Sequence, residues 1–400
     1  MKFMWMLLFM VLPLVGIAYV CWHVWAVLPL ATVWKLLIII LGIGCFLLLF
    51  VNFSGFMERQ PLPLARASYE IGTSTLFILL YLVILFLLLD LGRLVHLVPR
   101  SWLFHNGVTA LAILGLMVAV FLYGNIHYKH KVRVPLELTT SKPLAKDYTI
   151  VMVSDLHIGY HNTRSELARW IDLINAEHPD LVLIAGDIID MSMRPLIEEN
   201  MAEEFHRLQA PVYACLGNHE HFGRAPQAKQ FYHDAGIRLL CDSAAVVDSS
   251  LVIIGREDRS NRHRKELKDL MSALNCPLGQ RPLATNGTQE LSTLNSQLST
   301  LNSPYTILLD HQPYNLEQAE EAGIDFQLSG HTHRGQVWPI SWITDAIYEC
   351  SWGSHQRGNT RYYISSGIGI WGGKFRIGSQ SEYVVATLKK GQNTFQEKID

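Results

Sequence analysis

The chain has 400 residues, of which 50% are hydrophobic and 17% are charged, and its formal net charge at pH 7 is -2. This length is too great for one ordinary domain, and the near-neutral charge argues against nucleic-acid binding, which requires a basic surface. The six cysteines are scattered without any Cys-x-x-Cys pair, which argues against a zinc ribbon and against a disulfide framework.

The first 126 residues are strongly apolar and nearly free of charge, which predicts membrane-spanning helices. Such a helix needs about 20 mostly apolar residues. Two alternatives are buried helices of a soluble core and, for the first run, a cleaved signal peptide. Uncharged runs of this length are rare in soluble cores, and the first run has no small-residue cleavage site. Four transmembrane helices are therefore expected, at 4–26, 33–53, 71–90 and 106–126.

The lysines and arginines between the predicted spans indicate the orientation of the chain. More of them flank the side that holds both termini than the opposite side. The first group is Lys2, Arg59, Arg66, Lys129, Lys131 and Arg133, and the second is Lys35, Arg93 and Arg100. This bias predicts a multi-pass protein of the cell membrane whose C-terminal two thirds lie in the cytoplasm.

The remaining residues resemble an ordinary soluble α/β domain. Residues 127–147 are predicted to be a linker with strand character, and the domain itself is predicted over 148–390. From Tyr148 onward, apolar strands alternate with helices such as 163–178, whose apolar residues recur at helical spacing. Later short β-rich segments predict a second sheet rather than further βαβ units.

A polar segment over 276–303 interrupts this pattern. It is rich in Ser, Thr, Asn and Gln and contains a near-perfect seven-residue repeat, LSTLNSQ followed by LSTLNS. The leucine spacing alone would suit a helix, but these polar residues disfavour helix interiors. The segment is predicted to be a disordered surface insertion that the chemistry does not need.

Five short polar motifs each follow a strand-like apolar run. Open α/β sheets bind their ligands just beyond the carboxyl ends of strands, so the motifs are expected to meet in one place. Taken singly, several of them are also ordinary turn sequences, because glycine and aspartate are common turn residues. The motifs are Asp155-Leu156-His157, Gly186-Asp187, Gly217-Asn218-His219-Glu220, His311-Gln312-Pro313 and Gly330-His331-Thr332-His333.

The side chains in these motifs are typical ligands of divalent cations. A carboxylate can bridge two cations, and imidazole nitrogens and amide oxygens complete their coordination shells. Two cations about 3.5–4 Å apart can clamp the attacking and leaving oxygens of a phosphoryl transfer, and they lower the pKa of bound water. Together the motifs predict a two-metal site, although their residue types do not assign each ligand to one metal.

The ordered series Asp-x-His, Gly-Asp, Gly-Asn-His, His and Gly-His-x-His resembles that of the calcineurin-like metallophosphoesterases over residues 148–388. The resemblance is closest to a membrane-associated bacterial branch whose last motif is GHTHGGQ. It implies a four-layer α/β/β/α sandwich behind the N-terminal helices, a binuclear metal centre and a metal-dependent phosphohydrolase activity.

The same resemblance implies roles for individual residues. Asp187 would bridge both metals, and His219 would protonate the leaving oxygen or stabilise the charge that develops on phosphate. The implied ligands are Asp155, His157 and His333 for the first metal, and Asn218, His311 and His331 for the second. Manganese, iron or zinc would suit this mixed set of Asp, His and Asn ligands.

Two further residues are candidates for substrate binding. Arg334 stands where the bacterial branch has a glycine, next to the last motif. Its guanidinium would either bind a substrate phosphate or point into water. His221 lies beside the third motif and is the second candidate.

The expected function is that of an integral membrane phosphohydrolase. It would cleave a phosphate ester or pyrophosphate bond with hydroxide activated by two divalent metal ions. The expected partners are the lipid bilayer and a phosphorylated small molecule or lipid-linked substrate, without nucleic acid. The alternative is a catalytically silent membrane sensor that binds metal or nucleotide. The complete ligand set and the proton donor favour the enzyme.

Overall fold

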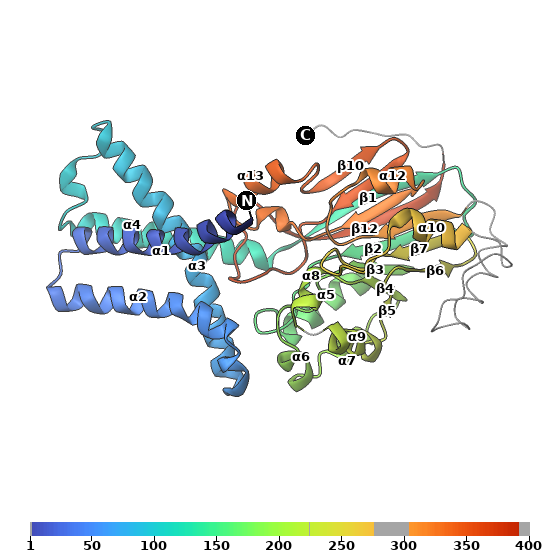
Figure 1. Cartoon of the computed structure of the whole chain (residues 1–400), viewed down its shortest axis with the longest axis horizontal. Helices are drawn as coiled ribbons and strands as arrows, with labels where there is room; N and C mark the ends of the chain where they lie inside the picture. Colours follow the sequence, from blue (N-terminus) through green and yellow to red (C-terminus); the bar gives the residue numbers. More distant parts are fainter. Residues whose placement is uncertain (1, 224, 276–303, 392–400) are drawn as a thin grey trace. The chain divides into compact units, whose positions relative to one another are not determined.

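The structure is a computed structural model that describes residues 2–223, 225–275 and 304–391 (Figure 1). The chain divides into two compact units. The helical unit comprises Met1–Tyr128 with Gly372–Phe375, and the phosphoesterase-like unit comprises Lys129–Trp371 with Arg376–Asp400. The polar segment predicted to be a disordered insertion, 276–303, lies outside the described residues.

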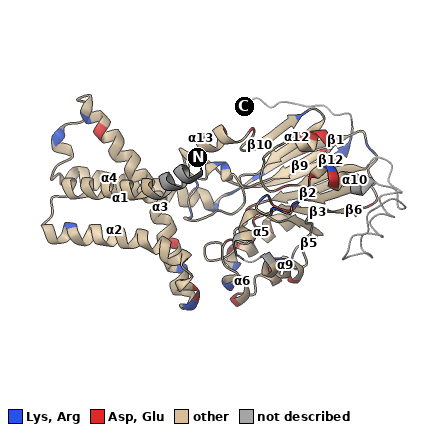
Figure 2. Cartoon of the chain, viewed as in Figure 1, with Lys and Arg blue, Asp and Glu red and all other residues tan. Residues whose placement is uncertain are grey.

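The helical unit contains long apolar helices with few charged side chains (Figure 2). They are α1 (Lys2–Val27), α2 (Thr32–Phe53), α3 (Leu62–Leu94) and α4 (Gly107–Lys129), with 3-10 turns η1 (Phe56–Arg59) and η2 (Arg100–Trp102). Within the described residues, α2, α3 and α4 are long and apolar enough to cross a membrane. The prediction of four spans is therefore wrong by one.

The difference lies in the first predicted span. Within α1, the stretch whose side chains the structure describes is Val11–Val27, which is apolar but shorter than a full span.

The helices of this unit pack around a small apolar core and a polar cluster. Val20, Phe46 and Phe86 are buried in the core. The Asp90 carboxylate accepts a hydrogen bond from the Tyr19 hydroxyl at 2.7 Å and lies 2.9 Å from Nε2 of His23. The His23 ring is buried and stacks on Phe86. The protein thereby supplies two partners for Oδ2 of Asp90, and the Arg93 guanidinium lies 3.6 Å from Oδ1.

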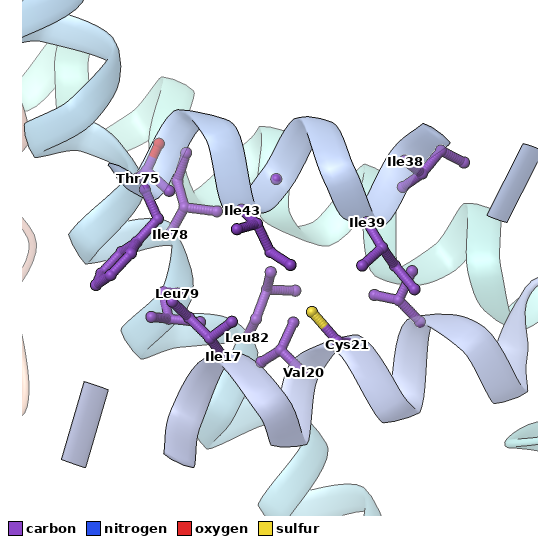
Figure 3. Close-up of a pocket in the computed structure, with 13 residues that line it drawn as sticks. Ile17, Val20, Cys21, Ile38, Ile39, Ile43, Thr75, Ile78, Leu79 and Leu82 are labelled. Carbon is purple, nitrogen blue, oxygen red and sulfur yellow. The ribbon is translucent and has the colours of Figure 1, made fainter. Parts of the chain in front are cut away.

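A cavity of about 200 Å³ lies among α1, α2 and α3 (Figure 3). Its lining is mostly aliphatic, and Gly42 leaves part of it open, since no atom lies within 4 Å of the place where a Cβ would stand. Cys21 and Thr75 add a thiol and a hydroxyl.

The phosphoesterase-like unit is built on two sheets. The first has the order β1-β12-β2-β3-β4-β5, in which β2 to β5 run parallel and β12 runs antiparallel to β2. Its strands are β1 (Lys131–Thr140), β2 (Tyr148–Val153), β3 (Leu181–Ala185), β4 (Val212–Cys215), β5 (Arg238–Leu239) and β12 (Ser381–Lys390). The predicted linker thus contains an edge strand, β1, which pairs with β12.

The second sheet has the order β10-β11-β9-β8-β7-β6. Its central strands run parallel, and β10 and β6 are antiparallel to their neighbours. The strands are β6 (Ser243–Val247), β7 (Leu251–Gly255), β8 (Tyr305–Leu309), β9 (Phe326–Ser329), β10 (Gly353–Arg357) and β11 (Thr360–Ile364). This is the second sheet that the short β-rich segments predict.

Apolar side chains join these sheets and the helices into four layers. One core packs α5 and α9 on the first sheet, a second lies between the sheets, and a third packs α10 and α12 on the second sheet. The mixed α/β sandwich is therefore confirmed (Figure 1). The helices are α5 (Arg164–Ala176), α6 (Arg194–Glu198), α7 (Ala202–Phe205), α8 (Asn218–Gly223), α9 (Ala225–Asp234), α10 (Leu267–Asn275), α12 (Glu317–Glu321), α13 (Ile340–Ile347) and the 3-10 turn η3 (His333–Gly335).

Candidate metal centre

The five polar motifs all begin where buried strands end. Asp155 follows β2, Asp187 follows β3 and Asn218 follows β4, in the first sheet. His311 follows β8 and His331 follows β9, in the second. These strands are parallel within each sheet, so their carboxyl ends meet at one edge of the sandwich. The topology therefore brings together side chains that are far apart in the sequence.

Several of these residues adopt a left-handed backbone conformation. The φ angles are 53° at Asp155, 45° at His157, 50° at Asp187, 71° at His331 and 48° at His333. A residue other than glycine rarely adopts such a φ angle, and the backbone strain costs about 1–3 kcal/mol for each residue. These angles turn the chain sharply after each strand and aim the side chains at one another.

Glycines in the motifs allow the loops to approach closely. A Cβ on Gly217 would stand 2.1 Å from Oδ1 of Asp187, and a Cβ on Gly330 would stand 2.3 Å from Oδ2 of Asp155. Backbone hydrogen bonds then join the loops, from the amide of His157 to the carbonyl of Asp187 and from that of Gly330 to the carbonyl of His311. The glycines thus belong to the site because no larger residue fits beside the carboxylates.

Three groups of potential metal ligands form among the described residues, each with its ligand atoms within 4.8 Å of one another. Asp187 belongs to two of them. The groups are Asp155, His157 and His333; His157, Asp187 and His219; and Asp187, His311 and His331. The structure therefore brings the Asp and His residues of the predicted ligand set together around one shared carboxylate.

Two contacts show that ring nitrogens converge on one another and on a carboxylate in this cluster. The Nε2 atoms of His157 and His333 are 3.0 Å apart, so they either share a proton or face one cation. His311 places Nδ1 2.7 Å from the carbonyl oxygen of Ala185. When Nδ1 donates there, Nε2 faces Oδ2 of Asp187 at 3.1 Å, so Nε2 either carries a second proton, which the raised pKa of His311 favours, or faces a cation.

Asn218 supports the same interpretation. Asn218 is buried, and within the described residues its Oδ1 has no hydrogen-bond partner. Leaving a buried amide oxygen unsatisfied costs about 1–3 kcal/mol, whereas a cation would satisfy it. The carboxylates, imidazoles and this amide oxygen therefore fit the divalent cations that the sequence predicts.

The charges of the cluster are strongly coupled. Burial alone would raise the pKa of Asp187, but the neighbouring His311 and His219 hold that pKa well below its usual range. Burial would lower the pKa of His219, but Asp187 and Asp190 raise it to about 9. For His331, burial and the nearby His311 together lower the pKa to about 4. Metal binding would displace the protons of the charged rings, because a protonated imidazole has no lone pair for a cation.

Asp190 and Glu220 support the site, although neither was predicted from the sequence to have a role. Oδ1 of the buried Asp190 lies 3.5 Å from Nδ1 of His157 and 3.2 Å from Nδ1 of His219. Glu220 accepts hydrogen bonds from the amides of Ile189 and Gly217. The available signal was spacing, because Asp190 lies three residues beyond Asp187 in the same loop.

Arg376 is a third supporting residue that the sequence did not indicate. Its side chain is fully buried and donates to the backbone carbonyls of His333, Ser366 and Gly369 at 2.6–2.8 Å. It thereby fixes the backbone that carries His333. Since these acceptors are main-chain atoms, no pattern of residue types could reveal the contact.

The two candidates for substrate binding lie outside the three ligand groups. The Arg334 guanidinium packs 4.0 Å from the ring centroid of Trp352, and Nε2 of His221 lies 2.9 Å from a carboxylate oxygen of Glu257. The role of each in substrate binding stays a prediction.

Comparison with known proteins agrees with this geometry. The sequence profile of the calcineurin-like phosphoesterases matches residues 148–335. An uncharacterized metallophosphoesterase of Campylobacter jejuni is 30% identical over 250 residues, which cover 62% of this chain and 60% of that protein. One of Bacillus subtilis is also 30% identical over 250 residues, covering 60% of this chain and 79% of the relative.

A relative from Danio rerio bears on the helical unit. It is named a transmembrane protein with metallophosphoesterase domain, and it is 28% identical over 256 residues, which cover 60% of this chain and 53% of the relative. The match thus spans less than two thirds of the Campylobacter and Danio proteins. A solved 5'-nucleotidase precursor from Thermus thermophilus is 15% identical with a TM-score of 0.33, covering 60% and 55% of the two chains, which is too distant to bear on function.

The apolar helices and the transmembrane relative indicate a membrane protein. The second unit carries the motif series, the sandwich fold and clustered Asp and His residues. The chain therefore belongs to the calcineurin-like metallophosphoesterase family.

Proposed function

We propose that this protein is a multi-pass membrane phosphohydrolase whose active site holds two divalent cations and faces the cytoplasm. The observation that carries the proposal is the position of Asp187, whose carboxylate belongs to two of the three ligand groups. A shared carboxylate is the element that a pair of cations needs in order to lie close together. The bias of lysine and arginine residues supports the cytoplasmic side.

The proposed ligands divide around Asp187. Asp155, His157 and His333 would bind one cation, and Asn218, His311 and His331 the other. When bound, the cations would neutralise charge on the phosphate and make water acidic enough to serve as the nucleophile near neutral pH. Either manganese, iron or zinc suits this donor set.

His219 is the proposed proton donor. Its Nδ1 faces Asp190 at 3.2 Å, and Nε2 is the nitrogen proposed to deliver a proton to the departing oxygen. Without metal, Asp187 and Asp190 raise the pKa of His219 to about 9. With cations on Asp187, the Asp190 carboxylate is the group that would still favour the protonated ring that a general acid requires. The backbone amide of His219 also donates to Oδ1 of Asp187 at 2.9 Å, so the acid and the bridging carboxylate are held together.

The proposed substrate is a phosphate ester or pyrophosphate, and a lipid-linked phosphate is the candidate that a membrane anchor favours. The test uses the full chain in detergent with manganese and bis(p-nitrophenyl) phosphate. Asp187→Asn and His219→Ala should each lower hydrolysis on the order of 10²-fold or more. The exposed residues Asp172 and His233 provide matched controls.

Asp172→Asn and His233→Ala should retain full activity. Retained activity in Asp187→Asn or His219→Ala would reject the roles proposed for these residues. Absence of hydrolysis by the wild-type chain with manganese, iron and zinc, on monoester and diester alike, would favour the silent sensor instead.

A further inference from the structure

An exposed apolar patch lies directly beside the candidate metal centre. Within the described residues of the phosphoesterase unit, five large hydrophobic side chains are exposed, and four of them belong to α13 and the loop before it. These four, which we call the α13 patch, are Trp338, Trp342, Ile343 and Ile347, with exposed fractions of 38%, 64%, 57% and 57%. The fifth is Ile197, on α6.

The helix presents this face to the outside instead of to a core. Its buried residue is a serine, Ser341, whereas Trp342 and Ile343 are exposed. The ring centroids of Trp338 and Trp342 lie 5.3 Å apart, so the loop and the helix share one apolar surface. A surface helix in a water-soluble domain instead buries its apolar face and exposes its polar face. An exposed apolar patch rimmed by polar residues marks an interaction site.

Both ends of α13 pack against the last metal motif or the turn that follows it. At its start, a Cβ on Gly335 would stand 2.4 Å from the amide nitrogen of Ser341, so η3 and α13 pack backbone against backbone. At its end, the ring centroid of Tyr348 lies 6.3 Å from that of His331. The orientation of the patch therefore fixes the orientation of the candidate active site.

The bilayer is the partner that this patch fits. The same chain carries helices that are long and apolar enough to cross a membrane, so lipid is always present at high effective concentration. Tryptophan side chains concentrate at the interface between lipid and water, where the ring is apolar and its N–H stays hydrated. Short amphipathic helices with Trp and Ile on one face lie in this interface.

We propose that the α13 patch inserts into the interfacial layer of the bilayer and holds the metal centre at the level of the lipid headgroups. If the proposed function holds, it follows that the enzyme takes a phosphorylated lipid headgroup from the membrane surface. The insertion itself requires no turnover and can be measured separately.

The test is quenching of tryptophan fluorescence by brominated phosphatidylcholine, with the full chain reconstituted in vesicles. The signal of Trp342 is the difference between the wild-type chain and Trp342→Phe, a variant that keeps an aromatic ring. Bromines near the headgroup should quench more than half of this difference signal, and bromines deep in the acyl chains should quench less. Trp34→Phe supplies the positive control, since Trp34 is 60% exposed on the spanning helix α2.

A second pair of variants tests the patch without removing Trp342. Ile343→Ser combined with Ile347→Ser should lower the quenching of Trp342 at least twofold, whereas Ile197→Ser, equally apolar and exposed, should leave it unchanged. Thermal unfolding of each variant establishes that it is folded. A Trp342 signal that neither bromine position quenches would overturn the proposed insertion. The patch would then be covered by a second copy of the chain or by another part of the same chain.

The two proposals fail in different ways. Hydrolysis of the soluble ester without quenching of Trp342 would leave the proposed function standing and reject the insertion. Quenching without hydrolysis would support insertion of a catalytically silent protein.

Discussion

The two units of this chain bury polar side chains in different ways. In the helical unit, Oδ2 of Asp90 is within hydrogen-bond distance of both Tyr19 and His23, so an acceptor meets donors. In the phosphoesterase unit, the Nε2 atoms of His157 and His333 face each other at 3.0 Å, so the two rings either share a proton or face one cation. The comparison teaches that ring nitrogens and carboxylates converging on one point, rather than burial of polar groups as such, distinguish a ligand site from a structural hydrogen-bond cluster.

Glycine-to-alanine substitutions should give the largest difference in activity between the two units. Gly217→Ala places a methyl group against Oδ1 and the backbone nitrogen of Asp187, so the carboxylate proposed to be shared by the cations must move. We expect hydrolysis of a soluble ester to fall on the order of 10²-fold, as displacements of about 1 Å at an active site do. Gly42→Ala in α2 meets no atom within 4 Å and should leave activity unchanged.

Hydrolysis assays and thermal unfolding of both variants check this prediction. Full activity in Gly217→Ala would mean that the loop tolerates a shift of Asp187, and the geometric argument for the shared carboxylate would fail.

Removal of divalent cations should affect only one unit. Cations that bind the folded state at 100 times their Kd stabilise it by about 2.7 kcal/mol. For a unit of this size a chelator should then lower the Tm by about 5–10 °C. Hydrogen exchange should report the loss in β2 and β9, next to Asp155 and His331, and not in α3.

Asp187→Asn should remove the effect of the chelator. An equal loss of protection in α3 would contradict the difference between the units, because the cluster around Asp90 has partners that the protein itself supplies.

The sequence indicated which Asp and His residues would cluster because its information on them is local. Each motif pairs a strand with the turn that follows it, and parallel strands bring such turns to one edge. Arg376 was missed because its partners are backbone carbonyls. Every residue has such a carbonyl, so the sequence does not show which ones Arg376 contacts. The strand β1 was assigned to a linker because its pairing with β12 joins residues about 250 positions apart. The apolar face of α13 was missed because eight residues are too few for a periodic pattern.

The polar cluster of the helical unit should contribute to stability but not to chemistry. Asp90→Ala removes the acceptor shared by Tyr19 and His23, and hydrogen bonds between membrane helices contribute about 0.6–2 kcal/mol. We expect a loss of about 1–2 kcal/mol in unfolding of the helical unit in detergent, with hydrolysis of a soluble ester unchanged. Asp90→Asn keeps an acceptor and should lose less.

A fall in hydrolysis by Asp90→Ala, with the protein still folded, would couple the helical unit to the metal centre. The cluster around Asp90 would then be more than structural.

The smallest effect is expected at Arg334, where two contributions oppose each other. Its φ of 48° is a conformation that favours glycine, so Arg334→Gly relieves about 1 kcal/mol of backbone strain. The same change removes the stacking of the guanidinium on Trp352, which contributes about 0.5–1 kcal/mol at a partly exposed site. Thermal unfolding should therefore shift by less than about 1 kcal/mol in free energy.

Steady-state kinetics of Arg334→Gly then decide between the two interpretations of this side chain. A raised KM with unchanged kcat would show that the guanidinium binds a substrate phosphate in both ground and transition states. Unchanged KM would show that Arg334 only packs on Trp352. Arg334→Lys is the matched control, because it keeps the charge and loses the planar stacking surface. A KM defect that lysine rescues therefore belongs to the charge, and one that lysine does not rescue belongs to the geometry of the guanidinium.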